Sequence, residues 1–215
     1  LPIKNYQTNV APAGEDLTLW EAPALREAFD HRGHQCNACG MRHCHMQLIP
    51  SGPHAGEIVD EPEYEGWASA GWTLGLTDRV AISWLNTQID RACVDVNEFG
   101  WVAGWVMECQ EKGLITKEQL GFELRWGDAE GAHRLLRMIT HREGFGDLLA
   151  EGVKRAAERL GGPAMECAVF TAKGATPRGH DHRGRWEEML DTCTASTGTL
   201  ETGNPVHPDE VGLPS

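Results

Sequence analysis

Apolar residues recur at helical spacing through most of the chain. Between residues 77 and 91 they stand at i, i+3 and i+4 positions, so they would share one face of a helix with Thr77 as its N-cap. That face consists of Val80, Ala81, Trp84, Leu85, Gln88 and Ile89. Similar patterns predict helices over residues 63–75 and 96–112, a short helical pattern over residues 16–30, and further helices starting at Thr116, Asp128 and Asp147.

Local signals for helix starts and stops agree with this pattern. Thr116 and Gln119 form a capping-box pair, and Gly113 ends the helix before it. The apolar run CAVFTA at residues 167–172 is the one predicted strand. Beyond Lys173 the chain turns to Gly, Pro, His, Asp and Thr, which is typical of a loop that forms a site. The predicted fold class is therefore mainly α, a multihelical array.

Residues 31–45, HRGHQCNACGMRHCH, interrupt the helical pattern with a Cys/His cluster loop. They contain Cys36, Cys39 and Cys44 in C-x2-C-x4-C spacing, four histidines and no apolar run. Thiolates so placed can reach one metal centre, either a [4Fe–4S] cluster with a fourth ligand from elsewhere or a structural zinc ion with one histidine. Three free buried cysteines are the remaining alternative, and the spacing alone does not choose between iron–sulfur and zinc.

The composition narrows the classes of function. The chain has 215 residues, 40% of them hydrophobic, which is enough for one large domain or two small ones. A net charge of −13 argues against a nucleic-acid or anionic-membrane surface. Seven unevenly placed cysteines do not suggest a disulfide framework, so we expect a reducing, cytoplasmic compartment. No run approaches the roughly 18 apolar residues of a membrane span, and no signal peptide is visible.

Four local patterns stand in order along the chain. They are the cysteine motif at 36–44, EPEYEGWASAGWTLGLTD at 61–78, DRACVDVNEFGWVAGWVMECQEKGLIT at 90–116, and the stretch at 142–185 that begins REGFGDLLAEGVKRAAERLG and ends AKGATPRGHDHRGR. Together with the opening LPIKNYQTNV they resemble the aldehyde ferredoxin oxidoreductase family, tungsten enzymes with two pterin cofactors and one [4Fe–4S] cluster. The resemblance covers nearly the whole chain and favours iron–sulfur over zinc at the cysteine motif.

The resemblance implies a polypeptide larger than this chain. In the family an N-terminal β-rich domain holds the pterins, and a later D-x-x-G-L-C motif supplies the fourth cluster cysteine. This sequence has neither, and Cys193 is a weak substitute. We therefore interpret the chain as an internal segment resembling the family's second domain. Its expected parts are an entering segment with the iron–sulfur cluster loop at 1–62, a helical body with the pterin motif at 63–165, and an active-site loop region at 166–215.

Two motifs depart from the family pattern. The cluster motif is usually C-x2-C-x3-C, and here one residue is added before Cys44. The first pterin motif, D-x-x-G-L-D, is here DRACVD at residues 90–95, with Cys93 where glycine is expected. The resemblance assigns Asp90 and Asp95 to the pterin, because a carboxylate can accept two hydrogen bonds from its amino and ring N–H groups. Solvated acids at a helix end are the alternative.

Cys93 becomes a candidate ligand of tungsten, because a thiolate suits a soft metal environment. In the aldehyde oxidoreductases the pterins hold the tungsten without a protein ligand. A cysteine-ligated tungsten is expected in a relative, the tungsten subunit of class II benzoyl-CoA reductase. The alternative is that Cys93 is a small buried hydrophobic residue.

Glu65 in PEYE and His180 in GHDHRG match positions where the family places an acidic residue and a histidine beside the metal. Histidine titrates near neutrality and a partly buried glutamate can be tuned there, so both suit proton delivery. The alternatives are a carboxylate at a helix start and a loop histidine bonded to the backbone. Asp181 and Arg183 are expected to hold the loop in place.

We therefore expect an oxidoreductase that uses a tungsten bis-pterin (tungstopterin) and a [4Fe–4S] cluster. Electrons from a ferredoxin-like iron–sulfur partner would pass through the cluster at Cys36, Cys39 and Cys44 to tungsten, which would reduce the aromatic ring of benzoyl-CoA. The alternatives are aldehyde oxidation with Cys93 merely buried and, from another class, a zinc-stabilised helical binding module. We also expect an oligomer with no nucleic-acid partner and no membrane span.

Overall fold

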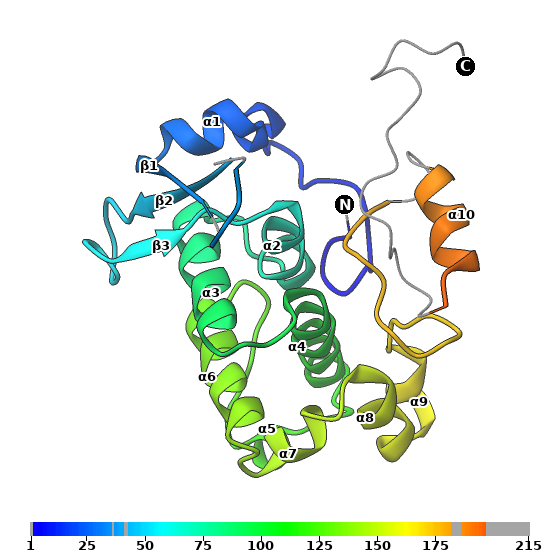
Figure 1. Cartoon of the computed structure of the whole chain (residues 1–215). Coiled ribbons are helices and arrows are strands. Elements are labelled where there is room, and N and C mark those ends of the chain that lie inside the picture. The colour runs from blue at the N-terminus through cyan, green and yellow to red at the C-terminus, as the bar shows by residue number, and fades with distance from the viewer. Residues whose placement is uncertain (1, 36, 41–42, 182–185, 197–215) are drawn as a thin grey trace.

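The computed structural model describes residues 2–35, 37–40, 43–181 and 186–196, so Cys36 and Arg183 lie outside it (Figure 1). Its helices are α1 (Ala22–Glu27), α2 (Tyr64–Ser69), α3 (Arg79–Arg91), α4 (Val96–Glu111), α5 (Lys117–Leu120), α6 (Ala129–Thr140), α7 (Phe145–Leu149), α8 (Val153–Leu160), α9 (Gly162–Glu166) and α10 (Trp186–Thr194). Two 3₁₀ helices, η1 (Leu17–Trp20) and η2 (Trp72–Leu74), and three strands, β1 (Asp30–His34), β2 (Cys44–Leu48) and β3 (Ile58–Asp60), are also present. None of the helices in these ranges combines the length and the apolar character that crossing a membrane requires.

Helix α4 lies at the centre of the helical body (Figure 1). It packs against α2, α3, α6 and α8. Its apolar side chains point in all directions, and Phe99, Trp105 and Val106 are between 0% and 1% exposed. A helix that is apolar all round is stable only when other elements surround it, so α4 is the core around which the mainly α fold assembles. The fold class that the sequence predicts is confirmed.

The predicted apolar face of α6 is confirmed, because Leu135, Leu136 and Ile139 are buried. The predicted face of α3 is confirmed in part: Trp84, Leu85 and Ile89 are buried, whereas Val80, Ala81 and Gln88 are only partly buried and Ile82 is buried in addition. Most of the predicted caps are also present. Asp128 caps α6 and Thr116 caps α5 through a capping box, as predicted. The cap of α3 is Asp78 rather than Thr77, because the Asp78 carboxylate accepts hydrogen bonds from two backbone N–H groups of the first turn.

Helix α2 approaches α3 and α4 very closely at two glycines. A Cβ atom added to Gly66 would lie 2.3 Å from Asn86 Oδ1, and one added to Gly100 would lie 2.6 Å from Ser69 O. Both distances are shorter than real Cβ contacts, so only glycine fits without a shift of the neighbours. These contacts fix the position of α2, which carries Glu65 in its first turn.

The prediction that residues 31–45 form a loop throughout is wrong, because both ends of this segment belong to strands. Strands β1 and β2 pair antiparallel, with Arg32 opposite Met46, and β3 pairs with the other edge of β2. Gln47 and Val59 are fully buried, and Ser83 of α3 donates a hydrogen bond to Gln47 at 3.3 Å. Every residue of β1 is exposed. Backbone pairing holds this edge strand, and such pairing leaves no apolar pattern in the sequence.

Three further predictions need correction. Residues 63–75 form two elements, α2 and η2, instead of one helix. The helix predicted from Asp147 is divided into α7 and α8, because Gly152 between them adopts a φ of 85°. Asp147 lies within α7 and pairs with Arg142, so it is not an N-cap. Residues 167–172 form no strand.

Candidate functional site

Residues 60–65, DEPEYE, lead from β3 into α2 and come near all three groups of predicted site residues. Each group has an acidic neighbour in this segment: Asp90 has Asp60, Cys44 has Glu63, and His180 has Glu65. The cluster loop, the pterin motif and the predicted proton donors therefore lie along one short piece of backbone.

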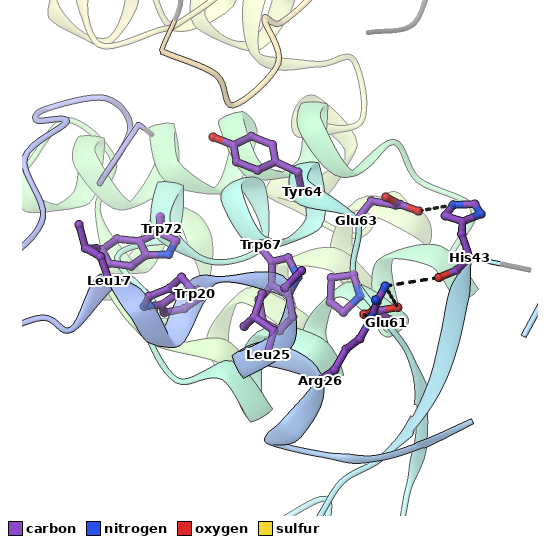
Figure 2. A pocket seen from close by; sticks show the side chains of 12 residues that line it. Leu17, Trp20, Leu25, Arg26, His43, Glu61, Glu63, Tyr64, Trp67 and Trp72 are labelled. Carbon is purple, nitrogen blue, oxygen red and sulfur yellow. Dashed lines mark hydrogen bonds and ion pairs between the residues drawn. The ribbon is translucent and has the colours of Figure 1, made fainter. Parts of the chain in front are cut away.

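Cys44, the first residue of β2, has His43 and Glu63 beside it (Figure 2 shows the last two). Cys44 Sγ lies 3.4 Å from His43 Nε2 and 3.7 Å from Glu63 Oε1, and the latter two atoms are 3.1 Å apart. Cys39, in the connection between β1 and β2, is half-buried like Cys44. Partly sheltered cysteines in this connection and at its end suit the thiolate ligation that an iron–sulfur cluster needs.

Glu61 forms ion pairs with Arg26 and His45 next to this loop. Arg26 Nε donates a hydrogen bond to Glu61 Oε1 at 2.7 Å, and His45 Nδ1 is hydrogen-bonded to Oε2 at 2.7 Å. Burial alone would raise the pKa of Glu61, but the hydrogen bonds from Arg26 and His45 outweigh it and hold the pKa below its usual value. The ring of His31 packs edge to face on His45, with 5.0 Å between centroids.

Glu65 and His180, predicted as proton donors, lie together. His180 Nε2 is 3.9 Å from Glu65 Oε1, and Arg178 Nη1 donates to the same oxygen at 2.9 Å. Tyr64 supports the histidine, because its ring meets the His180 ring edge to face at 4.6 Å and its hydroxyl donates to Gly179 O at 3.1 Å. The arrangement suits a short proton path. Sequence reasoning missed Arg178, and a basic residue two positions before His180 was its only signal.

Helix α4 anchors the loop that carries His180. Thr176 Oγ1 donates to Glu98 Oε2 at 2.8 Å, and Trp101 Nε1 donates to a loop carbonyl at 2.6 Å. Asp181 accepts a hydrogen bond from Asn9 Nδ2 at 2.6 Å, which agrees with its expected role in holding the loop. The buried helix α4 thus positions a loop whose own residues are too polar to form a hydrophobic core.

Asp90 and Asp95 are both exposed by surface area but have different partners. Asp90 Oδ2 accepts one hydrogen bond, from Asn86 Nδ2 at 3.0 Å. Partial loss of water around its carboxylate and the nearby charge of Asp60 raise the pKa of Asp90. Such a carboxylate would gain from further N–H donors, as its assignment to a pterin requires. Asp95 is exposed and caps α4, because its Oδ1 accepts from Glu98 N at 2.7 Å. Only its other oxygen is left for a cofactor.

Cys93 lies in the turn that ends α3. Its N–H donates to Asp90 O at 2.9 Å, and the Val94 N–H donates to Ile89 O at 3.3 Å, which is the Schellman pattern. Cys93 has a φ of 55°, in the left-handed region that favours glycine, where an L-residue costs about 1 to 2 kcal/mol. Its side chain is exposed on this chain, so Cys93 does not belong to the core that these residues form.

A cavity of 370 Å³ lies beside Glu63 and Tyr64, between α1 and α2 (Figure 2). Its walls include three tryptophans, Trp20, Trp67 and Trp72. The apolar pattern predicts Trp67 and Trp72 only as helix residues, because a cavity between two elements depends on how they pack.

Comparison with known proteins places these features in a family. A family model described as aldehyde ferredoxin oxidoreductase, domains 2 and 3, matches residues 1–214. The tungsten-containing aldehyde ferredoxin oxidoreductase of Pyrococcus furiosus is 32% identical over 216 residues, covering 99% of this chain and 34% of the relative. The WOR-like subunit of aliphatic sulfonate oxidoreductase from the same organism is 37% identical over 122 residues, covering 57% of this chain and 20% of that protein. The chain spans about a third of the length of the first of these relatives.

A solved structure has the same fold. It is the active-site complex BamBC of benzoyl-coenzyme A reductase with 1,5-dienoyl-CoA, which matches with a TM-score of 0.71 and 18% identity over 97% of this chain and 32% of that chain. This likeness concerns the multihelical fold. With the family match over almost its whole length, the chain belongs to the aldehyde ferredoxin oxidoreductase family.

Proposed function

We propose that the polypeptide carrying this chain is a tungsten-pterin and [4Fe–4S] oxidoreductase that reduces the ring of an aromatic acyl-CoA. Cys93 is the observation that supports the choice of reaction. It is an exposed thiol in a left-handed position, where the family motif has glycine. A strained residue of this kind persists when its side chain has a use, and a thiolate is a ligand suited to tungsten.

The other site residues have separate tasks in this proposal. Cys39 and Cys44, together with Cys36, would hold the cluster through their thiolates, and Asp90 would accept hydrogen bonds from a pterin. When bound, the tungsten and the cluster supply the electron transfer. The residues described here supply the ligands, the orientation and the protons.

Glu65 and His180 would supply the protons that an aromatic ring must take up with electrons. Arg178 Nη1 donates a hydrogen bond to Glu65 Oε1 at 2.9 Å, which holds the Glu65 side chain in one orientation before and after it gives up a proton. Tyr64 holds His180 from the other side, with ring centroids 4.6 Å apart. A proton donor that is fixed in place before the substrate arrives loses less entropy in the reaction.

Oxidation of aldehydes to acids is the second candidate. The identity of 32% with a tungsten-containing aldehyde ferredoxin oxidoreductase over 99% of this chain favours it. Under this candidate Glu65 and His180 would accept protons rather than donate them, and Cys93 would have no bond to the metal.

The test is metal analysis and assay of the intact polypeptide, purified without oxygen. We expect tungsten and iron without zinc, and oxidation of a reduced low-potential dye that depends on benzoyl-CoA. Turnover of benzaldehyde but not of benzoyl-CoA would replace the first reaction by the second. Zinc without tungsten or iron would reject both and support a zinc-stabilised binding module.

A further inference from the structure

The cavity between η1, α1 and α2 is built as an aromatic binding site (Figure 2). Trp20 stands edge to face against Trp67, with ring centroids 5.9 Å apart, and against Trp72, at 4.9 Å. Leu17 and Leu25 complete the apolar wall. A volume of 370 Å³ is at the lower end of the range for small-molecule pockets, so one or two rings would fill it.

Two indole N–H groups in this wall have no acceptor. Trp20 Nε1 donates to Glu15 Oε1 at 2.9 Å. Trp67 and Trp72 are only 8% and 2% exposed, and within the residues that the structure describes their N–H groups make no hydrogen bond. Neither nitrogen is among the fully buried polar atoms without a partner, so both keep access to open space and can donate to a bound molecule. An acceptor oxygen on a ligand in the cavity would therefore be favourable.

Charged residues at the polar end of the cavity select against anions. Glu61 and Glu63 line it together with Arg26 and His43. Arg26 is already paired with Glu61, and His43 with Glu63. Two carboxylates therefore face one permanently charged cation, so an added carboxylate would meet net repulsion, whereas an uncharged carbonyl compound would not.

We propose that this cavity binds the flat ring of an uncharged aromatic carbonyl compound, with the carbonyl oxygen accepting a hydrogen bond from an indole N–H. Tyr64 lines the cavity and touches His180 with its ring, so the cavity adjoins the Glu65 and His180 pair. That this ring belongs to the substrate rests on the proposed function. An aromatic thioester and an aromatic aldehyde both have the required chemistry, and the carboxylate product of aldehyde oxidation does not.

The test is calorimetric binding to the intact, cofactor-loaded polypeptide. The probes are benzamide, which has the ring and the carbonyl but no reactive group, cyclohexanecarboxamide, which lacks the flat ring, and benzoate, which adds the charge. We expect benzamide to bind about tenfold more tightly than either of the others, because aromatic contacts and an unopposed charge each contribute on the order of 1 kcal/mol. Equal affinity for all three probes, or no binding of benzamide, would overturn the proposal.

Two variants locate the binding in the cavity. Trp20→Leu removes a partly exposed wall, and Trp72→Phe keeps a ring but removes an N–H donor. Both should weaken benzamide binding, the first by about tenfold. Trp186→Leu is the matched control, because Trp186 on α10 is 62% exposed and does not line the cavity. Benzamide binding that is unaffected by Trp20→Leu would place the probe elsewhere and reject the cavity.

The outcome separates this proposal from the proposed function. If benzamide binds as expected but neither benzoyl-CoA nor benzaldehyde is turned over, the cavity stands and the proposed function fails. If either compound is turned over with a KM that Trp20→Leu does not change, the cavity is not the substrate site. Protection of Trp20 from acrylamide quenching in the probe-free polypeptide would show that another part of the protein fills the cavity, which would also reject it.

Discussion

Helices α3 and α6 end in the same strained turn but use it differently. The turn after α3 has Cys93 at a φ of 55°, and the turn after α6 has Arg142 at 53°. Both close with the same pair of backbone hydrogen bonds. The Arg142 guanidinium reaches Asp147 Oδ1 at 2.9 Å and Glu151 Oε1 at 2.9 Å. The thiol of Cys93, by contrast, is exposed, and no hydrogen bond to it is found in the part of the chain that the structure describes.

This difference separates two reasons for backbone strain. The left-handed conformation aims Arg142 at two acids, so contacts within the chain explain it. Contacts among the described residues do not explain Cys93. Backbone strain that no contact within the chain compensates points to a group that the chain binds. For this reason the proposed function rests on the turn after α3.

The largest effect is expected for metal binding. Cys93→Ala and Cys93→Gly both remove the thiol, so we expect one sulfur ligand fewer at tungsten and a loss of ring reduction by at least about 100-fold, as for a lost metal-ligand contact. X-ray absorption at the tungsten edge and steady-state assay of the intact polypeptide measure both. Arg142→Ala is the control and should leave both values unchanged. If the number of sulfur ligands at tungsten were unchanged in Cys93→Ala, Cys93 would not bind the metal, and the turn after α3 would have no role that the turn after α6 lacks.

A smaller effect is expected for stability. Cys93→Gly should raise the free energy of unfolding by about 0.5 to 1 kcal/mol, because relief of the left-handed conformation exceeds the entropy that glycine adds to the unfolded chain. Cys93→Ala keeps the strain and should change little. Arg142→Gly relieves the same strain but loses two ion pairs, so its gain should be smaller.

Urea unfolding of the metal-free proteins measures these differences. If Cys93→Gly and Cys93→Ala were equally stable, the turn after α3 would store no strain. The comparison between the two turns would then lose its physical basis.

The smallest effect is expected for the pH dependence of stability. The pKa values of two acids, Asp90 near the first turn and Glu151 paired with Arg142 of the second, are shifted in opposite directions. The pKa of Asp90 is raised by partial burial and then by Asp60, so its ionised form opposes folding above its usual pKa of 3.8. Asp90→Asn should therefore raise the thermal midpoint at pH 7, and this gain should vanish below pH 3.8. The pKa of Glu151 is lowered by its hydrogen bond to Arg142, so Glu151→Gln should lower the midpoint at pH 7, and this loss should disappear as the pH falls through the lowered pKa of Glu151.

Thermal unfolding followed by circular dichroism at pH 7 and at about pH 3 tests both variants, with the two pH values placed on either side of the usual carboxyl range. An Asp90→Asn midpoint that is lower than wild type at pH 7 would show that Asp90 has favourable partners beyond Asn86.

Helical periodicity predicted α3, α4 and α6 because burial of one face, or of all faces, dominates their sequences. It failed where a distant residue decides the local structure. Val153 N–H begins α8 by donating to Glu98 Oε1 at 2.8 Å, and no pattern near residue 153 indicates that cap. It also missed β1, whose exposed residues DHRGH have no apolar alternation.

Motifs predicted Cys44, Asp90, Glu65 and His180 one at a time, and their roles stay predictions, as does that of Cys36, which lies outside the described residues. They did not indicate that residues 60–65 would lie near three groups of these residues. That convergence depends on the folded path of the chain, as do the ion pair from Arg178 and the aromatic cavity. Short motifs therefore predict the chemistry, whereas tertiary contacts determine the geometry.

The glycine contacts of α2 limit how this protein can be recombined with its relatives. Since Gly66 leaves no room beside Asn86, and Gly100 none beside Ser69, an α2 or α4 from a relative with a larger residue at either position would clash with its new neighbour. Chimeras that cross over between residues 66 and 100 and bring in such a residue should misfold, whereas exchange of residues 60–111 as one block should be tolerated. The interchangeable unit in laboratory evolution would then be a three-helix block.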